Sequence, residues 1–287
     1  MDDLDERAPA KLNLALHVVG RRGDGYHLLD TLVVFPEIAD GLSARPAPGL
    51  VLDVDGPFAA ATPAGNDNLV LRAARMLRAR CESVGAHLKL TKNLPVEAGI
   101  GGGSADAAAA LRLLNRMWGC DLDPAALASL GAGLGADVPM CVHSRPLRAR
   151  GIGEDVVPLA GWPAIDLVLV NPARRLRVAD MFAALREPHG TGLGEVPRSF
   201  KDAADLAAYL KSLRNDLEAP ARDRAPELAA ALKELGARPG CLMARMSGSG
   251  PTVFGIFAAA AEAARAAGWM SAQHSDWWVA ATRADAS

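Results

Sequence analysis

The sequence predicts an α+β protein of two domains, and three observations lead to this class. Its 287 residues suit one large or two ordinary domains. Half of the residues are apolar and 22% are charged, so a well-buried core is expected. Segments with the periodicity of strands and of helices follow one another along the chain, without an internal repeat.

The first half of the chain predicts strands at 8–18 and 29–38, joined by an exposed glycine-rich turn at 20–26. A short strand at 50–54 precedes a helix over 68–84, for which Asn66 or Asp67 is available as the cap. Residues 87–91 alternate like a strand, and the alanine-rich run at 105–118 predicts a helix. A further helix begins at Asp123-Pro124, a cap followed by proline in the first turn.

The second half predicts a sheet with helices on one face. Strands are expected at 165–170, 252–257 and 277–282, with residues 243–246 leading into the second of them. Helices are expected at 178–185, 202–213, 228–235 and 258–267. We therefore divide the chain into an N-terminal domain of residues 1–163 and a C-terminal domain of residues 164–287.

Composition excludes several classes of protein. A net charge of −2 with scattered arginines argues against nucleic-acid binding through counterion release. No apolar run reaches about 18 residues, so no membrane partner is expected. The acidic start of the chain lacks the features of a signal peptide, which predicts a cytoplasmic protein. We also expect a monomer or a weak homodimer. The four cysteines have neither CxxC nor metal-ligand spacing, which predicts reduced thiols.

The most informative segment is residues 95–105, Pro-Val-Glu-Ala-Gly-Ile-Gly-Gly-Gly-Ser-Ala, between the predicted strand at 87–91 and the helix at 105–118. Glycine allows positive φ and close approach of backbone to a ligand. A helix start adds free N–H groups, so this order favours an anion site, most often for phosphate. The segment lacks the lysine of a P-loop and the spacing of a dinucleotide fingerprint. The alternative is a tight turn whose small residues allow close packing.

Two more segments accompany this loop. The first is Ala8-Pro-Ala-Lys11-Leu-Asn13-Leu with Gly20-Arg-Arg-Gly-Asp-Gly-Tyr26-His27, and the second is residues 246–255, Met-Ser-Gly-Ser-Gly-Pro-Thr-Val-Phe-Gly. In this order the three resemble the GHMP kinases, a superfamily of small-molecule kinases. The resemblance implies a ribosomal-S5-like N-terminal domain, a ferredoxin-like C-terminal domain, ATP as the phosphate donor and Mg²⁺. The opening segment further implies a cytidine diphosphate-linked methylerythritol as the small-molecule acceptor, phosphorylated on its 2-hydroxyl.

The resemblance implies that Lys11 and Asp137 form the catalytic pair. A lysine on a predicted strand is usually a solvated edge residue, but a cation beside a phosphoryl group stabilises developing charge. A carboxylate within reach of the acceptor hydroxyl can act as general base, and a nearby lysine favours its ionised form. The alternative for Asp137 is a helix cap or an Asx-turn.

The resemblance assigns the ATP phosphates to the glycine loop: Pro95, Val96, Glu97, Ala98, Gly99, Ile100, Gly101, Gly102, Gly103, Ser104 and Ala105. Ser104 Oγ could reach phosphate or Mg²⁺, and no cluster of protein metal ligands is needed, because Mg²⁺ usually keeps waters. Asp106 could serve only to complement the helix dipole. Asn68 and Lys92 are expected to border the nucleotide, with a helix cap and a solvated lysine as the alternatives.

For the acceptor, the resemblance points to Asn13, Tyr26 and His27 as readers of the cytosine, and to Phe182 on the other face of the base. Asn and His can each donate and accept hydrogen bonds, and Tyr can stack. Gly248, Ser249 and Gly250 are expected against the substrate. Turn packing is the alternative for Tyr26-His27, a core position for Phe182 and a tight hairpin connector for the second glycine segment. Val178 stands where the family frequently has Ser or Thr, which weakens this part of the mapping.

Two rival functions remain at this stage. One is another GHMP kinase, such as a homoserine or mevalonate kinase. The other is a non-catalytic nucleotide- or RNA-binding module on an S5-like scaffold, against which the near-neutral charge and the Lys11/Asp137 pair argue.

Overall fold

The computed structural model describes residues 4–63, 65–81, 85–185 and 190–286. The chain forms two compact units that interleave along the sequence. Unit 1 comprises the chain up to Lys11, Ile38–Val96 and Gly101–Ser144. Unit 2 comprises Leu12–Glu37, Glu97–Ile100 and the chain from Arg145 onward. The glycine loop at 95–105 is thus shared between the two units.

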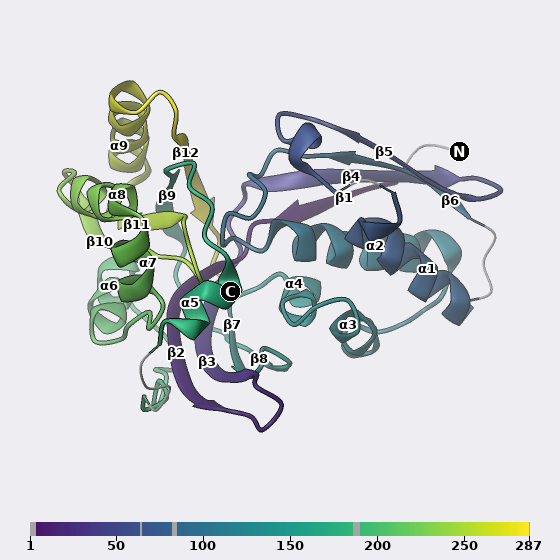
Figure 1. Cartoon of the computed structure of the whole chain (residues 1–287), viewed down its shortest axis with the longest axis horizontal. Coiled ribbons are helices and arrows are strands. Elements are labelled where there is room, and N and C mark those ends of the chain that lie inside the picture. The colour runs from purple at the N-terminus through teal and green to yellow at the C-terminus, as the bar shows by residue number, and fades with distance from the viewer. Residues whose placement is uncertain (1–3, 64, 82–84, 186–189, 287) are drawn as a thin grey trace. The chain divides into compact units, whose positions relative to one another are not determined.

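Unit 1 is a four-stranded sheet with helices on one face (Figure 1). The strand order is β1-β4-β6-β5, and only β5 and β6 run parallel, because α1 connects them as a crossover. The elements of the unit are β1 (Leu4–Pro9), β4 (Ala39–Pro46), β5 (Leu50–Asp55), α1 (Leu69–Cys81), β6 (Ala86–Thr91), α2 (Gly102–Trp118), α3 (Pro124–Ala132) and α4 (Val138–His143).

The alanines of α2 explain how this helix reaches the core of unit 1. Every residue from Ala105 to Ala110 is buried, and side chains this small let the helix lie close to β1 and β4. Leu42, Leu88 and Leu90 point from the sheet toward the helices and are fully or almost fully buried. The start of α2, which carries the glycine loop, is therefore fixed by the core.

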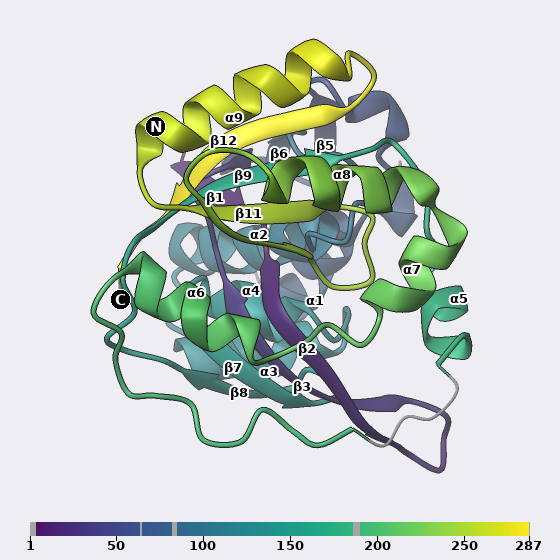
Figure 2. The ribbon, with the colours of Figure 1, turned by 90° about the vertical axis from the view of Figure 1, so that its left-hand side faces the viewer.

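Unit 2 contains two antiparallel sheets, with strand orders β2-β3-β7-β8 and β10-β11-β9-β12. Figure 2 shows α8 and α9 on one side of the second sheet. The elements are β2 (Leu12–Arg21), β3 (His27–Val34), β7 (Leu147–Gly151), β8 (Asp155–Pro158), β9 (Ile165–Asn171), α5 (Val178–Ala183), α6 (Ala203–Lys211), α7 (Glu218–Arg224), α8 (Pro226–Gly236), β10 (Cys241–Met246), β11 (Val253–Phe257), α9 (Ala260–Gln273) and β12 (Trp278–Ala284).

The prediction of helices on only one face of the second sheet is wrong in one respect. Met246 joins the core cluster that includes residues of α7, α8 and α9. Its neighbour Arg245 points to the opposite face, since side chains alternate along a strand. There it donates to the carbonyls of Leu14, Leu210 and Leu213 at 2.7–2.9 Å, so the end of α6 lies on the second face.

The first predicted strand, 8–18, is two strands in the structure. β1 ends at Pro9 and β2 begins at Leu12, so Lys11 lies in the gap between them rather than on a strand. The strand predicted at 29–38 is likewise too long, since β3 ends at Val34. The helix predicted at 68–84 is α1, but its last three predicted residues, 82–84, lie outside the described part.

The cap of α1 is also not the predicted one. Asn68 Oδ1 accepts from the amide of Val70 at 2.9 Å, which satisfies an N–H group of the first turn. Asn66 instead binds Arg75 on the helix surface. In contrast, Asp123 caps α3 as predicted, by accepting from the amide of Ala126 at 2.7 Å.

The prediction of reduced thiols is wrong for two of the four cysteines. Cys81, the last residue of α1, and Cys120, just beyond α2, form a disulfide. Cys141 is buried and free, and Cys241 is free and partly buried. Sequence spacing gave no indication of the pair, because the two cysteines meet only when the C-terminal ends of α1 and α2 pack together.

Candidate active site

Lys11 and Asp137, the predicted catalytic pair, form an ion pair within unit 1. Lys11 Nζ lies 3.0 Å from Asp137 Oδ1. The lysine side chain is 6% exposed and that of Asp137 is 41% exposed. Asp137 occupies the N-cap position of α4, but its side chain accepts no capping hydrogen bond. Its carboxylate is therefore held by the ammonium and remains open to a ligand.

A neighbouring thiol does not compete for this chemistry. Burial, and then the charge of Asp137, raises the pKa of Cys141 to about 12. Cys141 therefore stays a neutral thiol at physiological pH and is a poor nucleophile.

The glycine loop opens α2 with free backbone donors. Gly101 is the N-cap in the left-handed region, with φ of 64°, and Ala105 N donates to Gly101 O at 2.8 Å as the first helical bond. The amides of Gly102, Gly103 and Ser104 precede that bond and have no intrahelical acceptor. A Cβ at Gly101 would lie 3.0 Å from Lys11 Cβ, so glycine lets the lysine side chain run directly along the loop.

Lys92 lies in a buried cluster and not on the surface. Its ammonium binds Asp106 at 2.7 Å and also contacts Asp40. Asp40 accepts in turn from the amides of Asn93 and Leu94, at the start of the glycine loop. Burial alone would lower the pKa of Lys92, but the two carboxylates raise it. Burial raises the pKa of Asp106 to about 7 against the opposing effect of Lys92.

This cluster revises two expectations. The alternative of a solvated lysine at Lys92 is wrong, and Asp106 does more than complement a helix dipole. Lys92 Nζ lies 3.2 Å from the position that a Cβ at Gly102 would take, so the cluster supports the first turn of α2 from within. Asn68, which caps α1, is also buried. A nucleotide contact by either Lys92 or Asn68 stays a prediction.

In unit 2, Ser247 joins the three segments that define the resemblance. Its hydroxyl donates to Gly99 O at 3.1 Å and accepts from Asn13 N at 3.1 Å. Thr252 N donates to Ala98 O at 3.2 Å. The second glycine segment connects β10 to β11, as a hairpin connector would, and it also binds residues 98–99 of the first loop.

Glycine is required at this junction. A Cβ at Gly99 would meet Gly250 O at 2.4 Å, and a Cβ at Gly248 would meet Asn13 Oδ1 at 3.1 Å. Ser249 is 9% exposed, so little of the second loop is open to solvent. The two loops fit together because neither has side chains at these positions.

Asn13 has one unused acceptor. Its Nδ2 donates to Thr31 Oγ1 at 2.8 Å, whereas its buried Oδ1 has no hydrogen-bond partner. An unpaired buried amide oxygen is costly unless a ligand pairs with it. Asn13 therefore presents an acceptor beside Gly248 and Ser247.

The structure separates Asn13 from the other predicted cytosine readers. On β3, His27 pairs with Arg21 and Val33 pairs with Asn13, six residues further along. At about 3.3 Å per residue this spans roughly 20 Å of strand. Asn13 and His27 thus lie toward opposite ends of the β2–β3 pair, and their contact with the cytosine stays a prediction.

His27 and Phe182 lie together at the far end of β3. Their rings stack with centroids 4.7 Å apart and an interplanar angle of 22°. Burial lowers the pKa of His27, and Arg21 adds to this, so the imidazole is neutral at pH 7. Phe182 also packs against the core cluster of unit 2, and Tyr26 is 59% exposed in the adjacent turn. Val178, which stands where the family frequently has Ser or Thr, is exposed on α5.

Sequence reasoning missed Ser247 as a junction, Asp40 as the partner of Lys92, and Thr31. Asp40 lies on β4, a strand that was not predicted, because its buried positions Asp40, Leu42 and Ala44 do not read as an apolar stripe. The one signal available in the sequence was local, because Ser247 directly precedes Gly248 in the second glycine segment. The structure shows both residues to be buried.

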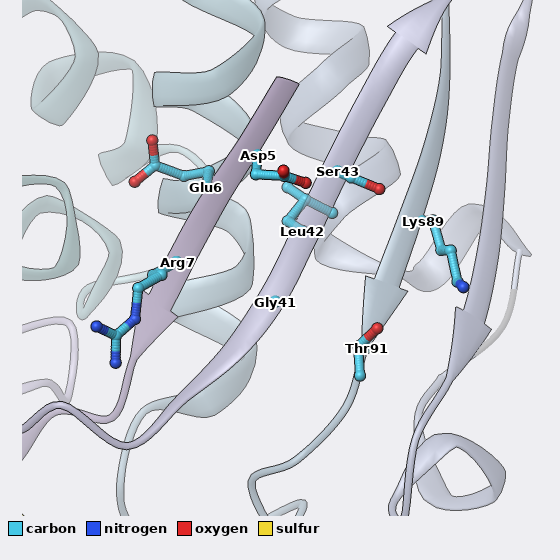
Figure 3. A pocket seen from close by; sticks show the side chains of 8 residues that line it. All are labelled: Asp5, Glu6, Arg7, Gly41, Leu42, Ser43, Lys89 and Thr91. Atoms are coloured by element: carbon cyan, nitrogen blue, oxygen red, sulfur yellow. The ribbon is translucent and has the colours of Figure 1, made fainter. Parts of the chain in front are cut away.

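An open pocket of about 580 Å³ lies elsewhere on unit 1, over β1, β4 and β6 (Figure 3). It is lined by Asp5, Glu6, Arg7, Gly41, Leu42, Ser43, Lys89 and Thr91, none of which is a predicted site residue.

Within the described ranges, no helix is long and apolar enough to span a membrane.

Two family models match segments of this chain. Residues 68–145 match the model of the GHMP kinases N terminal domain. Residues 181–269 match the model of the GHMP kinases C terminal domain. The chain belongs to the GHMP kinases, enzymes that use ATP as the phosphate donor.

Full-length relatives narrow the family further. A protein of Cereibacter sphaeroides named 4-diphosphocytidyl-2-C-methyl-D-erythritol kinase is 50% identical over 278 residues, 96% of this chain and 97% of the relative. A crystal structure of 4-(cytidine 5'-diphospho)-2C-methyl-D-erythritol kinase matches with TM-score 0.80 and 33% identity, covering 98% of this chain and 99% of that one. Within the GHMP kinases, the chain thus belongs to the 4-diphosphocytidyl-2-C-methyl-D-erythritol kinase family.

A more distant match shows the fold alone. The crystal structure of a homoserine kinase from Cytophaga hutchinsonii has TM-score 0.74 at 16% identity, covering 100% of this chain and 95% of that chain.

Proposed function

We propose that this protein transfers the γ-phosphoryl group of ATP to the 2-hydroxyl of 4-diphosphocytidyl-2-C-methyl-D-erythritol. The products are the 2-phosphate and ADP, and the step belongs to the non-mevalonate pathway of isoprenoid biosynthesis. The observation that carries the proposal is the Lys11–Asp137 ion pair beside the free amides that open α2. The names of the 50% identical relatives supply the acceptor.

The donor side rests on the backbone of the glycine loop. The amides of Gly102, Gly103 and Ser104 point from the helix start, where the dipole also favours negative charge. These groups would hold phosphates of ATP without a P-loop lysine. The glycines keep side chains away from the approaching phosphate oxygens.

The transfer itself needs a base and a cation. Asp137 accepts the proton of the acceptor hydroxyl, whose oxygen forms the new bond to the γ-phosphorus. The bond from the γ-phosphorus to the bridging oxygen of ADP breaks, and ADP leaves with that electron pair. Lys11 stabilises the negative charge on the transferring phosphoryl oxygens. It also orients the carboxylate, which it holds at 3.0 Å.

Mg²⁺ fits the donor set near the loop. Mg²⁺ takes one or two protein oxygens together with waters and phosphate oxygens. The Ser104 hydroxyl at the start of α2 is an oxygen donor of this kind. When bound, the ion would neutralise charge on the phosphates of ATP.

The acceptor residues of unit 2 suit an extended substrate. His27 and Phe182 offer a stacking surface at one end of the β2–β3 pair, and the unpaired Asn13 Oδ1 offers an acceptor at the other end. A cytidine diphosphate-linked polyol has a base at one end and hydroxyls at the other. We assign the base to His27 and Phe182, and the polyol to Asn13, from which only Leu12 separates Lys11 along the chain.

Three further parts of the proposal concern the whole protein. We place the functional boundary between the domains at residues 163 and 164, between the two matched segments. We propose that the enzyme acts in the cytoplasm. We also propose that it works as a monomer or a weak homodimer.

The test is an acceptor panel followed by substitution of the base. Release of ADP is measured with the cytidylyl acceptor, homoserine and mevalonate, and we expect turnover only with the first. Turnover of homoserine without turnover of the cytidylyl acceptor would contradict the proposed substrate.

Asp137→Asn is expected to abolish transfer and to leave ATP affinity within about threefold, because the amide cannot take the proton. Asp123→Asn is the matched control, since asparagine also caps helices and Asp123 caps α3 in the same unit. Wild-type-like turnover by Asp137→Asn would refute its assignment as the base.

A further inference from the structure

One guanidinium in unit 1 contacts the chain segments that lead to both catalytic residues. Arg112 lies in the middle of α2, the helix that begins at the glycine loop. Its Nε donates to Glu6 Oε1 at 3.1 Å, and its Nη2 donates to Arg7 O at 3.0 Å. Its Nη1 donates to Cys141 O at 2.7 Å. Arg112 therefore binds β1 and α4 at the same time.

The contact with α4 is made at the end of that helix opposite to Asp137. Cys141 belongs to the last turn of α4, whose carbonyl oxygens receive no hydrogen bond from an amide of the same helix. The Cys141 carbonyl accepts from Arg112 and also from the Ser144 hydroxyl, at 2.6 Å. A cation there also complements the helix dipole. α4 has six residues and is about 9 Å long, so a shift of its C-terminal end moves its N-cap, Asp137.

The contacts with β1 fix the segment that precedes Lys11. Glu6 and Arg7 lie next to one another on β1 (Figure 3), and the Glu6 carboxylate is directed away from Ser43 and Lys89. β1 ends at Pro9, and Ala10 N donates to Ile38 O at 3.0 Å, directly before Lys11. Holding Arg7 therefore limits the movement of the lysine backbone.

We propose, on the basis of the function proposed above, that Arg112 is a positioning residue that sets the separation of Lys11 and Asp137. Its side chain is 18% exposed, and it supplies the link between the segment before Lys11 and the helix after Asp137. A planar fork of five donors is needed to reach acceptors on two elements at once, which lysine lacks. Because a misplacement of 1 Å can cost about a hundredfold in rate, loss of this link should appear in kcat.

The principal variant is Arg112→Met, which keeps the apolar stem and removes every donor. We expect kcat to fall about tenfold to a hundredfold, with KM for ATP and for the acceptor within about threefold. We expect the Lys11–Asp137 distance in the crystal structure of the variant to exceed about 4 Å. Arg112→Lys should fold readily and restore part of kcat, since one donor group can still reach Cys141 O.

Arg116→Met is the matched control on the same helix. Arg116 binds Glu6 Oε2 at 2.6 Å and Asp5 O at 3.2 Å, and so shares the partner on β1 without touching α4. We expect its kcat to stay within about twofold of the wild type, because exposed ion pairs contribute little. An equal loss in Arg116→Met would overturn the proposal.

Two other results would also overturn it: wild-type kcat in Arg112→Met, or a Lys11–Asp137 distance that stays near the present value in that variant. The crystallographic distance does not depend on the acceptor. If the wild type phosphorylates none of the acceptors in the panel, the proposed function fails, and the distance still decides the role of Arg112.

Discussion

Gly101→Ala should separate the cost of backbone strain from the cost of displacing Lys11. Gly101 has φ of 64° and is the N-cap of α2. The new Cβ would lie 3.0 Å from Lys11 Cβ and 3.2 Å from Lys11 Cε, closer than ordinary contacts. Two consequences follow, one for the stability of the protein and one for the position of the catalytic lysine.

The stability effect comes from the backbone. An L-residue in the left-handed region costs about 1–2 kcal/mol. For a chain of 287 residues each kcal/mol lowers Tm by about 2 °C. The catalytic effect comes from Lys11, which must move by a few tenths of an ångström, and we expect kcat to fall about tenfold. Thermal unfolding and steady-state kinetics measure the two effects separately.

Gly119→Ala supplies the matched control at the other end of α2. Gly119 has φ of 62°, and nothing lies within 4 Å of its added Cβ. It should therefore lose a similar amount of stability and keep its kcat. Two results would refute this reasoning: Gly101→Ala folds and keeps kcat within twofold of the wild type, or both variants lose kcat equally. In either case the contact with Lys11 would not be the reason why position 101 requires glycine.

Three further predictions concern other parts of the molecule. His27→Ala should raise KM for the cytidylyl acceptor about 5- to 150-fold and leave KM for ATP unchanged, because base stacking contributes about 1–3 kcal/mol; an unchanged acceptor KM would contradict the assignment. Reduction of Cys81–Cys120, which are 39 residues apart, should lower the free energy of unfolding by up to about 4 kcal/mol, and a thiol count of four in the untreated denatured protein would refute the bond. Burial would raise the pKa of Asp30, but hydrogen bonds from Arg148 and the Leu193 amide, with the charge of Arg148, together hold it below its usual value, so this carboxylate stabilises the fold above about pH 4 and the contribution is lost as pH falls further. The stability difference between wild type and Asp30→Asn should therefore shrink below pH 4 in acid denaturation, and a constant difference would argue against it.

Strong local patterns predicted the elements around the glycine loop. The alternation at 87–91 corresponds to β6 (Ala86–Thr91), and the alanine-rich run corresponds to α2 (Gly102–Trp118). β7 (Leu147–Gly151) was missed, because its arginines Arg148 and Arg150 leave few apolar residues in this short strand. In the structure Arg148 pairs with Asp30 on β3, a partner that only the sheet brings near.

The resemblance selected the residues of the candidate site, and their contacts came only from the structure. The resemblance selected Lys11 and Asp137, and the structure places them 3.0 Å apart. Pairing of Lys92 with two carboxylates could not be predicted, because one of them lies on an unpredicted strand. The separation of Asn13 from His27 depends on strand register, which the sequence alone does not specify.

The sequence by itself determined the glycine loop before α2 and the family to which the chain belongs. Both depend on neighbouring residues: glycine permits positive φ, and periodic apolar residues predict helix and strand. Only the tertiary structure decided that Asn13 and Ser247, 234 residues apart, share a hydrogen bond, and that Arg112 binds both β1 and α4. Such contacts depend on which segments pack together, and local propensity carries no information about a partner that lies far away in the chain.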